Sequence, residues 1–311
     1  MQRARLKPHG HRVRFITFAA ALLAVLQMIE LVPASAATVE RIRETGKLTL
    51  GYRADGRPFS YQDSSGNADG YAVALCKDIA ERLKAELGVA DLAVEWVPVT
   101  GDDQFGAIQS GKVDLLCGAA ETLSSRKDAD FSVPIFPGGT GVLLRADAPI
   151  GLREVLAGRP PSGPLWRGNP AQVLEKQVFA VVAGTPTEKW VKDRLGQLQV
   201  SAEVVAVDSY DAGIQSVLDR RTNAFFADRS ILLDAATRNA SARELMVLDR
   251  QFNYAPVALA LARNDADFQL AVDRALSALF GSEGFLRVYE KWFGKPSGEA
   301  DTFFKMSTLP E

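Results

Sequence analysis

Arginine, acidic and hydroxyl side chains stand shortly after four expected β-strands of this chain. Those that could do chemistry together are Arg53, Glu121, Arg126, Thr187 and Asp228. Sites in open α/β sheets form beyond the carboxyl ends of the strands, which is where these side chains belong. An arginine binds a carboxylate through paired hydrogen bonds, and a carboxylate accepts hydrogen bonds from an ammonium group. Two arginines in one half of the chain and an aspartate in the other therefore suit a small zwitterion, although each residue could instead be a solvated loop charge.

The elements that must position these side chains alternate along the chain. The expected strands lie at 47–52, 92–97, 113–117, 178–183, 203–207, 224–227 and 257–262, and the expected helices at 71–87, 105–109, 188–195, 211–220 and 266–292. The β-α-β-α-β order restarts after a loop at 158–170 that holds four prolines and three glycines. This alternation predicts an α/β protein with two similar units and mostly parallel sheets, followed by a tail at 294–311 that wraps the surface.

Composition excludes several other classes of chemistry. The two histidines, His9 and His11, both lie in the first 14 residues, which look like a removable segment. Without them the chain has no imidazole, so a Ser-His-Asp triad, a Cys-His pair and a histidine-bound zinc are excluded. A hydrophobic content of 47% with 24% charged residues is typical of a globular protein, and 36 basic against 38 acidic residues do not favour nucleic acid as a partner. We expect neither a metal nor another cofactor.

The amino terminus has the pattern of an export signal. Five basic side chains precede an apolar run at 15–26, and Ala34-Ser35-Ala36 follows as a cleavage site. The alternative is a membrane anchor, but twelve apolar residues form only ~18 Å of helix, which is short of a ~30 Å hydrocarbon core. We therefore expect residues 1–36 to be a signal peptide that is cleaved after Ala36, and the remaining protein to be periplasmic.

Export places the two cysteines, Cys76 and Cys117, in an oxidising compartment. Only one pairing is available, and it would close a loop whose chain-entropy contribution is ~4 kcal/mol. The alternative is a pair of buried free thiols. We expect a structural disulfide rather than a redox site.

Five short motifs follow one another in the order found in a known family. They lie at 51–63, 70–79, 109–118, 126–132 and 289–293. Together they resemble the polar amino-acid-binding proteins of ABC importers, solute-binding family 3, nearest the glutamate/aspartate-binding branch. The resemblance implies the two-lobed periplasmic-binding-protein type II fold, with a ligand cleft between the lobes and crossover strands near 142–145 and 252–257. It implies one lobe from residues 37–146 plus 253–311 and the other from residues 147–252.

The same resemblance implies roles for single residues. Arg126 matches the arginine that holds the ligand's α-carboxylate, and Asp228 matches the acid that takes the α-ammonium. Phe59 lies in the loop whose aromatic side chains flank the ligand. Arg53 matches an arginine that reads an acidic ligand side chain, and Tyr210 falls where that branch has histidine. The full set of expected ligand-binding residues is Arg53, Phe59, Ala119, Glu121, Arg126, Thr187, Tyr210 and Asp228.

This sequence departs from the family pattern at positions that bear on the ligand. Gln104 stands where the acidic-ligand branch has another arginine, and Pro186, which has no N–H, stands where a threonine usually donates. Glu121 replaces a hydroxyl that usually meets the carboxylate, and it would repel an acidic ligand unless it pairs with Arg53 or Arg126. Glutamate is therefore one candidate ligand, and a ligand with an additional cationic or hydroxyl group is another.

The expected function is capture of an amino acid or a related zwitterion and its delivery to an ABC permease, by a monomer that is not an enzyme. The rival is a periplasmic dehydratase of the cyclohexadienyl type, acting on arogenate or prephenate, with Glu121 or Glu188 as the proton donor after burial raises its pKa. A sensor domain is a third alternative, but it needs a membrane helix and an output module.

Overall fold

The computed structural model describes residues 38–101, 103–159 and 170–310. The expected signal peptide at 1–36 and most of the loop at 158–170 lie outside these residues. None of the helices in the described ranges combines the length and the apolar character that crossing a membrane requires.

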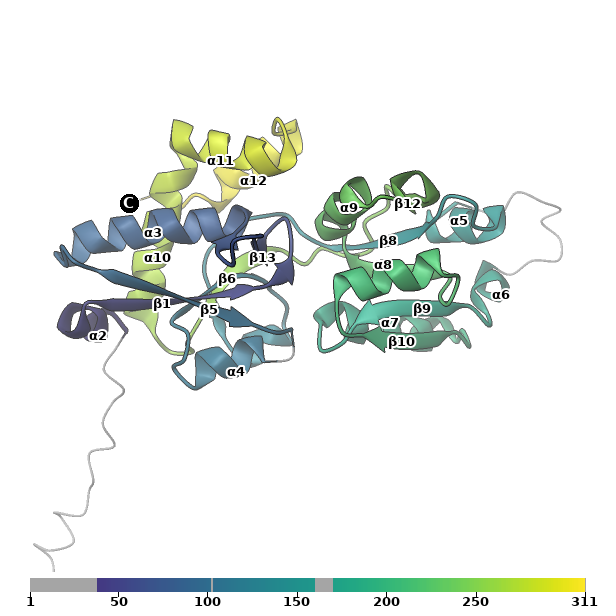
Figure 1. Cartoon of the computed structure of the whole chain (residues 1–311), viewed down its shortest axis with the longest axis horizontal. Coiled ribbons are helices and arrows are strands. Elements are labelled where there is room, and N and C mark those ends of the chain that lie inside the picture. The colour runs from purple at the N-terminus through teal and green to yellow at the C-terminus, as the bar shows by residue number, and fades with distance from the viewer. Residues whose placement is uncertain (1–37, 102, 160–169, 311) are drawn as a thin grey trace, which may run out of the picture. The chain divides into compact units, whose positions relative to one another are not determined.

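The first sheet has five strands in the order β5-β1-β6-β13-β7 (Figure 1). Its strands are β1 (Lys47–Arg53), β5 (Ala93–Val99), β6 (Leu115–Ala120), β7 (Asp130–Phe131) and β13 (Val257–Leu261). The strand β1 runs parallel to β5 and β6, whereas β13 pairs antiparallel with β6 and β7. The parallel strands therefore end at one edge of the sheet, and Arg53 is the last residue of β1 at that edge.

The second sheet also has five strands, in the order β10-β9-β11-β8-β12. Its strands are β8 (Thr140–Arg145), β9 (Val178–Val182), β10 (Glu203–Val207), β11 (Ala224–Asp228) and β12 (Leu245–Val247). The three strands β9, β10 and β11 are parallel, as the restarted sequence pattern predicted, and β8 and β12 add an antiparallel edge. A small third sheet contains β2 (Asp55–Gly56), β3 (Ser60–Gln62) and β4 (Ala68–Asp69).

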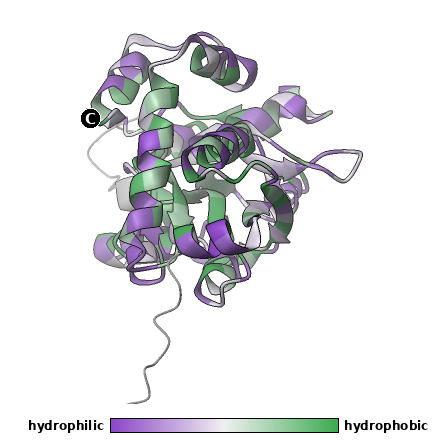
Figure 2. Cartoon of the chain, turned by 90° about the vertical axis from the view of Figure 1, so that its left-hand side faces the viewer, coloured by the Kyte–Doolittle hydropathy of each residue, from purple (hydrophilic) through white to green (hydrophobic). Residues whose placement is uncertain are grey.

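Helices cover both sheets. Those packed with the first sheet are α2 (Thr38–Thr45), α3 (Tyr71–Leu87), α4 (Gln104–Gln109), α10 (Ala266–Phe280), α11 (Glu283–Phe293) and α12 (Gly298–Ser307), and those of the second are α5 (Ile150–Leu156), α6 (Pro170–Leu174), α7 (Pro186–Leu198), α8 (Tyr210–Leu218) and α9 (Arg229–Arg238). Hydrophobic residues concentrate in the strands and on the inner helix faces, and hydrophilic residues cover the outer faces (Figure 2).

The helix α3 confirms the sequence pattern that predicted it. Ile79 and Leu83 are fully buried, and Gly88 ends the helix with a left-handed φ of 70°, a conformation that glycine adopts without steric strain. One expectation at the carboxyl end was wrong. The helical stretch expected at 266–292 is two helices, because Ser282 caps the start of α11 by accepting a hydrogen bond from the Phe285 N–H. The tail beyond it contains a further helix, α12.

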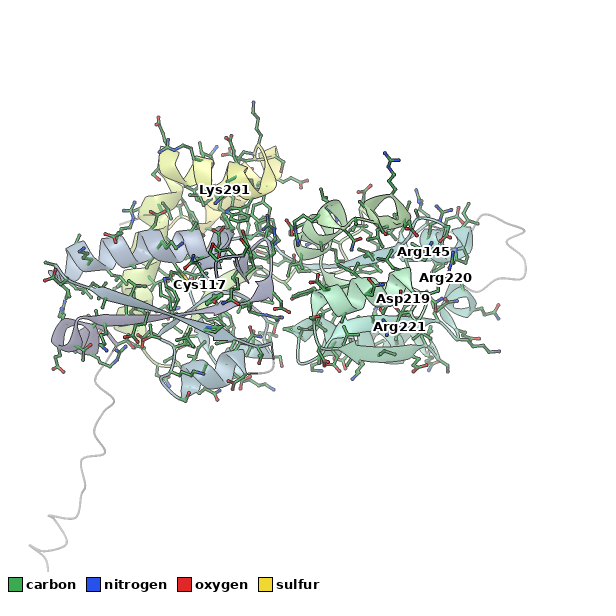
Figure 3. All side chains as sticks on the ribbon, viewed as in Figure 1. Cys117, Arg145, Asp219, Arg220, Arg221 and Lys291 are labelled. Atoms are coloured by element: carbon green, nitrogen blue, oxygen red, sulfur yellow. A yellow bond between two sulfur atoms is a disulfide. The ribbon has the colours of Figure 1, made fainter. Side chains whose placement is uncertain are left out.

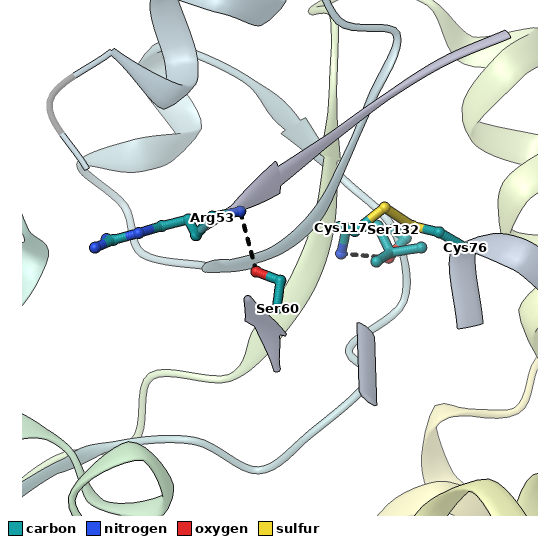
Figure 4. The surroundings of a disulfide bond; sticks show 6 residues. Arg53, Ser60, Cys76, Cys117 and Ser132 are labelled. Atoms are coloured by element: carbon teal, nitrogen blue, oxygen red, sulfur yellow. Dashed lines mark hydrogen bonds between the residues drawn. A yellow bond between two sulfur atoms is a disulfide. The ribbon is translucent and has the colours of Figure 1, made fainter. Parts of the chain in front are cut away.

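The disulfide between Cys76 and Cys117 is present, as predicted (Figure 4). Both residues are fully buried, and the bond joins α3 to β6 in the core of the first sheet. It therefore fixes a covering helix to the strand that leads into the loop of Glu121 and Arg126.

The chain crosses between the two sheets twice, and the two crossing segments, 137–139 and 252–256, are hydrogen-bonded to each other. The Ala255 N–H donates to the Gly138 carbonyl at 2.9 Å, and the Phe252 N–H donates to the Thr140 carbonyl at 2.8 Å. A Cβ atom at Gly139 would lie 2.1 Å from the Asn253 carbonyl oxygen, so this approach requires glycine.

The first crossing lies earlier than the resemblance implied. The strand β8, expected to be the crossover and to belong with residues up to 146 of the first lobe, pairs along its length with β11 of the second sheet. The glycines that precede β8, Gly138 and Gly139, permit a close approach to the second crossing segment, which a side chain at either position would prevent.

Candidate functional site

A cavity lies where the ends of strands from both sheets meet. Its walls come from β1, β3, β6 and α4 on one side and from β9, β11 and the first turns of α7, α8 and α9 on the other. Expected site residues that line it are Arg53, Phe59, Ala119, Thr187, Tyr210 and Asp228. Glu121 and Arg126 are not among the lining residues.

Arg53 brings a cationic group into this cavity from the end of β1. Its side chain is only 9% exposed and extends away from the disulfide (Figure 4). Its Nε and Nη2 donate to Oδ1 of Asp55 at 3.0 Å and 2.8 Å, and its backbone N–H donates to the Ser60 hydroxyl at 3.1 Å. The guanidinium carbon lies 5.2 Å from the ring centroid of Tyr210, which belongs to α8. Arg53 thus contacts side chains on both sides of the cavity.

Asp228 supplies the acidic group from the end of β11. Its Oδ1 accepts a hydrogen bond from the Ser230 N–H at 2.8 Å and so caps α9, while its Oδ2 accepts from the Gly139 N–H of the first crossing segment at 3.1 Å. Desolvation raises the pKa of this carboxyl to about 6, although the backbone donors oppose the shift. A carboxylate that is desolvated in this way is stabilised more by a cationic partner than an exposed carboxylate would be.

Glu121 and Arg126 bind each other. The Arg126 Nε donates to Oε1 of Glu121 at 2.9 Å, and the arginine side chain is 59% exposed while the glutamate side chain is only 11% exposed. The loop between them, through Thr122 to Ser124, borders a groove that also reaches Asp228. The groove and the cavity share Ala120, Pro186, Thr187 and Asp228, so the loop that joins Glu121 to Arg126 borders a groove that adjoins the cavity.

The first turn of α7 forms another wall. Thr185 caps this helix, accepting from the Glu188 N–H at 3.4 Å and donating to the Val182 carbonyl at 2.7 Å. Pro186 occupies the first helical position, where the absence of an N–H costs nothing. Glu188 accepts from Lys192 and from the Gly184 N–H, and these contacts lower its pKa. An acid with a lowered pKa is poorly suited to donate a proton, which weakens the dehydratase hypothesis.

Two residues near the cavity were missed by the sequence reasoning. Asp55 was not considered, although residues two apart on an extended chain point to the same side, so its position after Arg53 was an available signal. Ser60 also lines the cavity and holds the backbone of Arg53 in place.

The comparisons with known proteins agree with this geometry. Residues 48–295 match the bacterial extracellular solute-binding proteins, family 3. An L-glutamate/L-aspartate-binding protein of Pseudomonas aeruginosa is 26% identical over 261 residues, which cover 83% of this chain and 80% of that protein. An L-cystine-binding protein of Escherichia coli is 22% identical over 262 residues, covering 82% and 86%.

Solved structures show the same fold. An ancestral amino-acid-binding protein, a precursor of cyclohexadienyl dehydratase, has a TM-score of 0.67 at 26% identity and covers 82% of this chain and 99% of its own. The solute receptor for L-cysteine of Neisseria gonorrhoeae has a TM-score of 0.68 at 24% identity, covering 84% and 98%. The curated relatives are binding proteins, not enzymes. This chain has the two-lobed type II periplasmic-binding-protein fold and belongs to the bacterial extracellular solute-binding proteins, family 3.

Proposed function

We propose that this protein captures an amino acid or a similar zwitterion in the cavity between its lobes and delivers it to an ABC permease. The observation that carries the proposal is the desolvated carboxylate of Asp228 in a cavity walled by both sheets. An ammonium group, such as the one an amino acid carries, is the partner that such a carboxylate needs. The amino-acid-binding relatives support the same conclusion.

In the proposed complex, Asp228 accepts hydrogen bonds from the ligand's α-ammonium, which supplies a cationic partner that its desolvated carboxylate lacks among the described residues. Arg126 takes the α-carboxylate by exchanging the Glu121 carboxylate for that of the ligand. The first turn of α7, with Thr187, adds helix-dipole stabilisation for the same negative group. Phe59 and Tyr210 form apolar walls, and Ala119 leaves room beside them.

The proposed location is the periplasm, reached through a signal peptide that is cleaved after Ala36. The family's extracellular character and the amino-terminal charge pattern support this location. The division into lobes is also a proposal: the first crossing segment marks the better boundary, with β8 assigned to the second lobe. The protein acts as a monomer.

Two variants test the site. Arg126→Ala and Asp228→Ala each remove a charge-assisted contact worth ~2–5 kcal/mol, so each is expected to weaken ligand binding at least ~30-fold. The controls are Lys127→Ala and Asp91→Ala, since both side chains are exposed. The ligand is first identified by native mass spectrometry of protein that is purified without denaturation, and affinity is then measured by calorimetry. Wild-type affinity in both site variants would refute the assignment.

A further inference from the structure

We propose that the ligand has no acidic side chain, because Asp55 already compensates the charge of Arg53 and so weakens its attraction for one. This inference rests on the proposed amino-acid-binding function. It departs from the glutamate and aspartate named for some relatives, and it makes Asp55 a specificity-determining residue.

The first argument is the geometry of the Arg53–Asp55 pair. Two donors of the guanidinium, Nε and Nη2, converge on a single oxygen of Asp55 at 3.0 Å and 2.8 Å. The arginine side chain is 9% exposed and the aspartate side chain 35%, so the pair is partly shielded from water. A second carboxylate brought by a ligand would have to share a guanidinium whose charge Asp55 already compensates.

The second argument is the charge of the cavity. Among the described residues that line it, the charged ones are Arg53 and Asp228, and the other polar side chains, such as Ser60 and Gln104, are neutral. Adding Asp55 to this pair leaves one cation against two carboxylates. A ligand with a net negative charge would therefore enter a site whose own charge is already negative.

The pKa of Tyr210 is affected by the same three charged side chains. Its pKa is raised by desolvation first, Arg53 opposes the shift, and both Asp55 and Asp228 raise the pKa further. The field of Asp55 therefore reaches the cavity wall on the far side of the guanidinium. Tyr210 itself remains a neutral phenol and contributes no charge to a ligand.

The third argument is that Arg126, the other nearby arginine, has the same arrangement. It pairs with Glu121, so each of the two arginines carries a carboxylate from its own loop. An amino acid with one carboxylate needs to compete with one of these internal partners. A dicarboxylic amino acid would need to compete with both.

The wild-type protein gives the first test. Ligand is removed by unfolding and refolding, and the thermal shift is measured with each of the twenty amino acids, including the isosteric pairs glutamine with glutamate and asparagine with aspartate. We expect the largest shift from an amino acid without an acidic side chain. A largest shift from glutamate or aspartate would overturn the inference while leaving the proposed function intact. No shift from any amino acid would overturn the proposed function and this inference with it.

The second test removes the Asp55 carboxylate. In Asp55→Asn the guanidinium loses the compensation that this carboxylate provides, so the affinity for glutamate or aspartate is expected to rise roughly tenfold to a hundredfold relative to the wild type. Asp91→Asn, an exposed control with the same change of charge, is expected to leave it unchanged. If Asp55→Asn folds, as judged by circular dichroism, and gains no affinity for either acidic amino acid, the role of Asp55 is refuted.

Discussion

Replacing Asp228 with asparagine should stabilise the ligand-free protein at alkaline pH while abolishing its ligand binding. The carboxylate loses solvation in the cavity wall, and this raises its pKa to about 6. Asparagine has nearly the same shape and can still cap α9 through its side-chain oxygen, because asparagine is among the best capping residues. The substitution therefore removes an unfavourable charge with little change in the local hydrogen bonds.

The magnitude follows from the shift. Relative to an ordinary aspartate near 4, a shift of about two pKa units corresponds to ~3 kcal/mol for holding the ionised form in the folded state. The Asp228 side chain is only half-buried, and asparagine is a weaker acceptor for the Gly139 N–H, so the expected net gain is about 1–2 kcal/mol.

The sign of the pH dependence is fixed by the direction of the shift. A raised pKa means that the folded state binds the proton more tightly than the unfolded chain, so the wild type loses stability as pH rises from about 4 to about 6. The variant lacks this loss. Its advantage should be small at pH 4 and complete above pH 7.

Urea unfolding of the ligand-free proteins at pH 4.5 and pH 8 measures this difference, with Asp91→Asn as the control. The reasoning is refuted if the advantage of Asp228→Asn does not grow with pH, or if the variant is less stable than the wild type at pH 8. Calorimetry on the same samples should show no binding of the ligand that the wild type retains.

Two other predictions concern stability away from the cavity. Reducing the disulfide, or replacing Cys76 and Cys117 together with serine, should lower the free energy of unfolding by ~4 kcal/mol and the thermal midpoint by about 10 °C; a midpoint that is unchanged on reduction would contradict the stabilising role. Asp147 binds Arg145 and Arg220 on the second sheet, where the two arginines lie side by side (Figure 3), and these contacts lower its pKa to about 2. The stabilisation that corresponds to this lowered pKa is present above pH 4 and is lost as pH falls toward 2. In acid unfolding, the wild type should therefore lose its stability advantage over Asp147→Asn across that interval. A stability difference that stays constant with pH would contradict the stabilising role of the Asp147 contacts.

Much of the fold could be predicted from the sequence because its strands and helices are short and periodic. The parallel strands β1, β5 and β6 and their counterparts β9, β10 and β11 lie close to the expected ranges. The sheet that receives β8 could not be predicted, since an apolar strand carries no information about its partner. That choice depends on the close approach of the glycine pair at 138–139 to the second crossing segment.

The candidate site was predicted less completely, for a different reason. Position after a strand places a residue at the sheet edge, but the direction of a long side chain depends on which partner it finds there. Arg53 reaches the cavity because its backbone is held by Ser60 and its guanidinium packs over Tyr210. Arg126 is not among the residues that line the cavity, and its side chain pairs with Glu121, five residues earlier.

These two arginines and Asp228 differ in how their charges are compensated. Each arginine has a carboxylate from its own loop, so neither leaves a large electrostatic penalty in the ligand-free protein. In the described part of the chain the donors to Asp228 are neutral, among them the N–H groups of Ser230 and Gly139, and desolvation raises its pKa. Because uncompensated charge is costly for folding, a residue in this condition is expected where a ligand supplies the missing partner. Under the proposed function, this contrast predicts that the cavity binds the ammonium end of the ligand most strongly, while the carboxylate end competes with the protein's own acids.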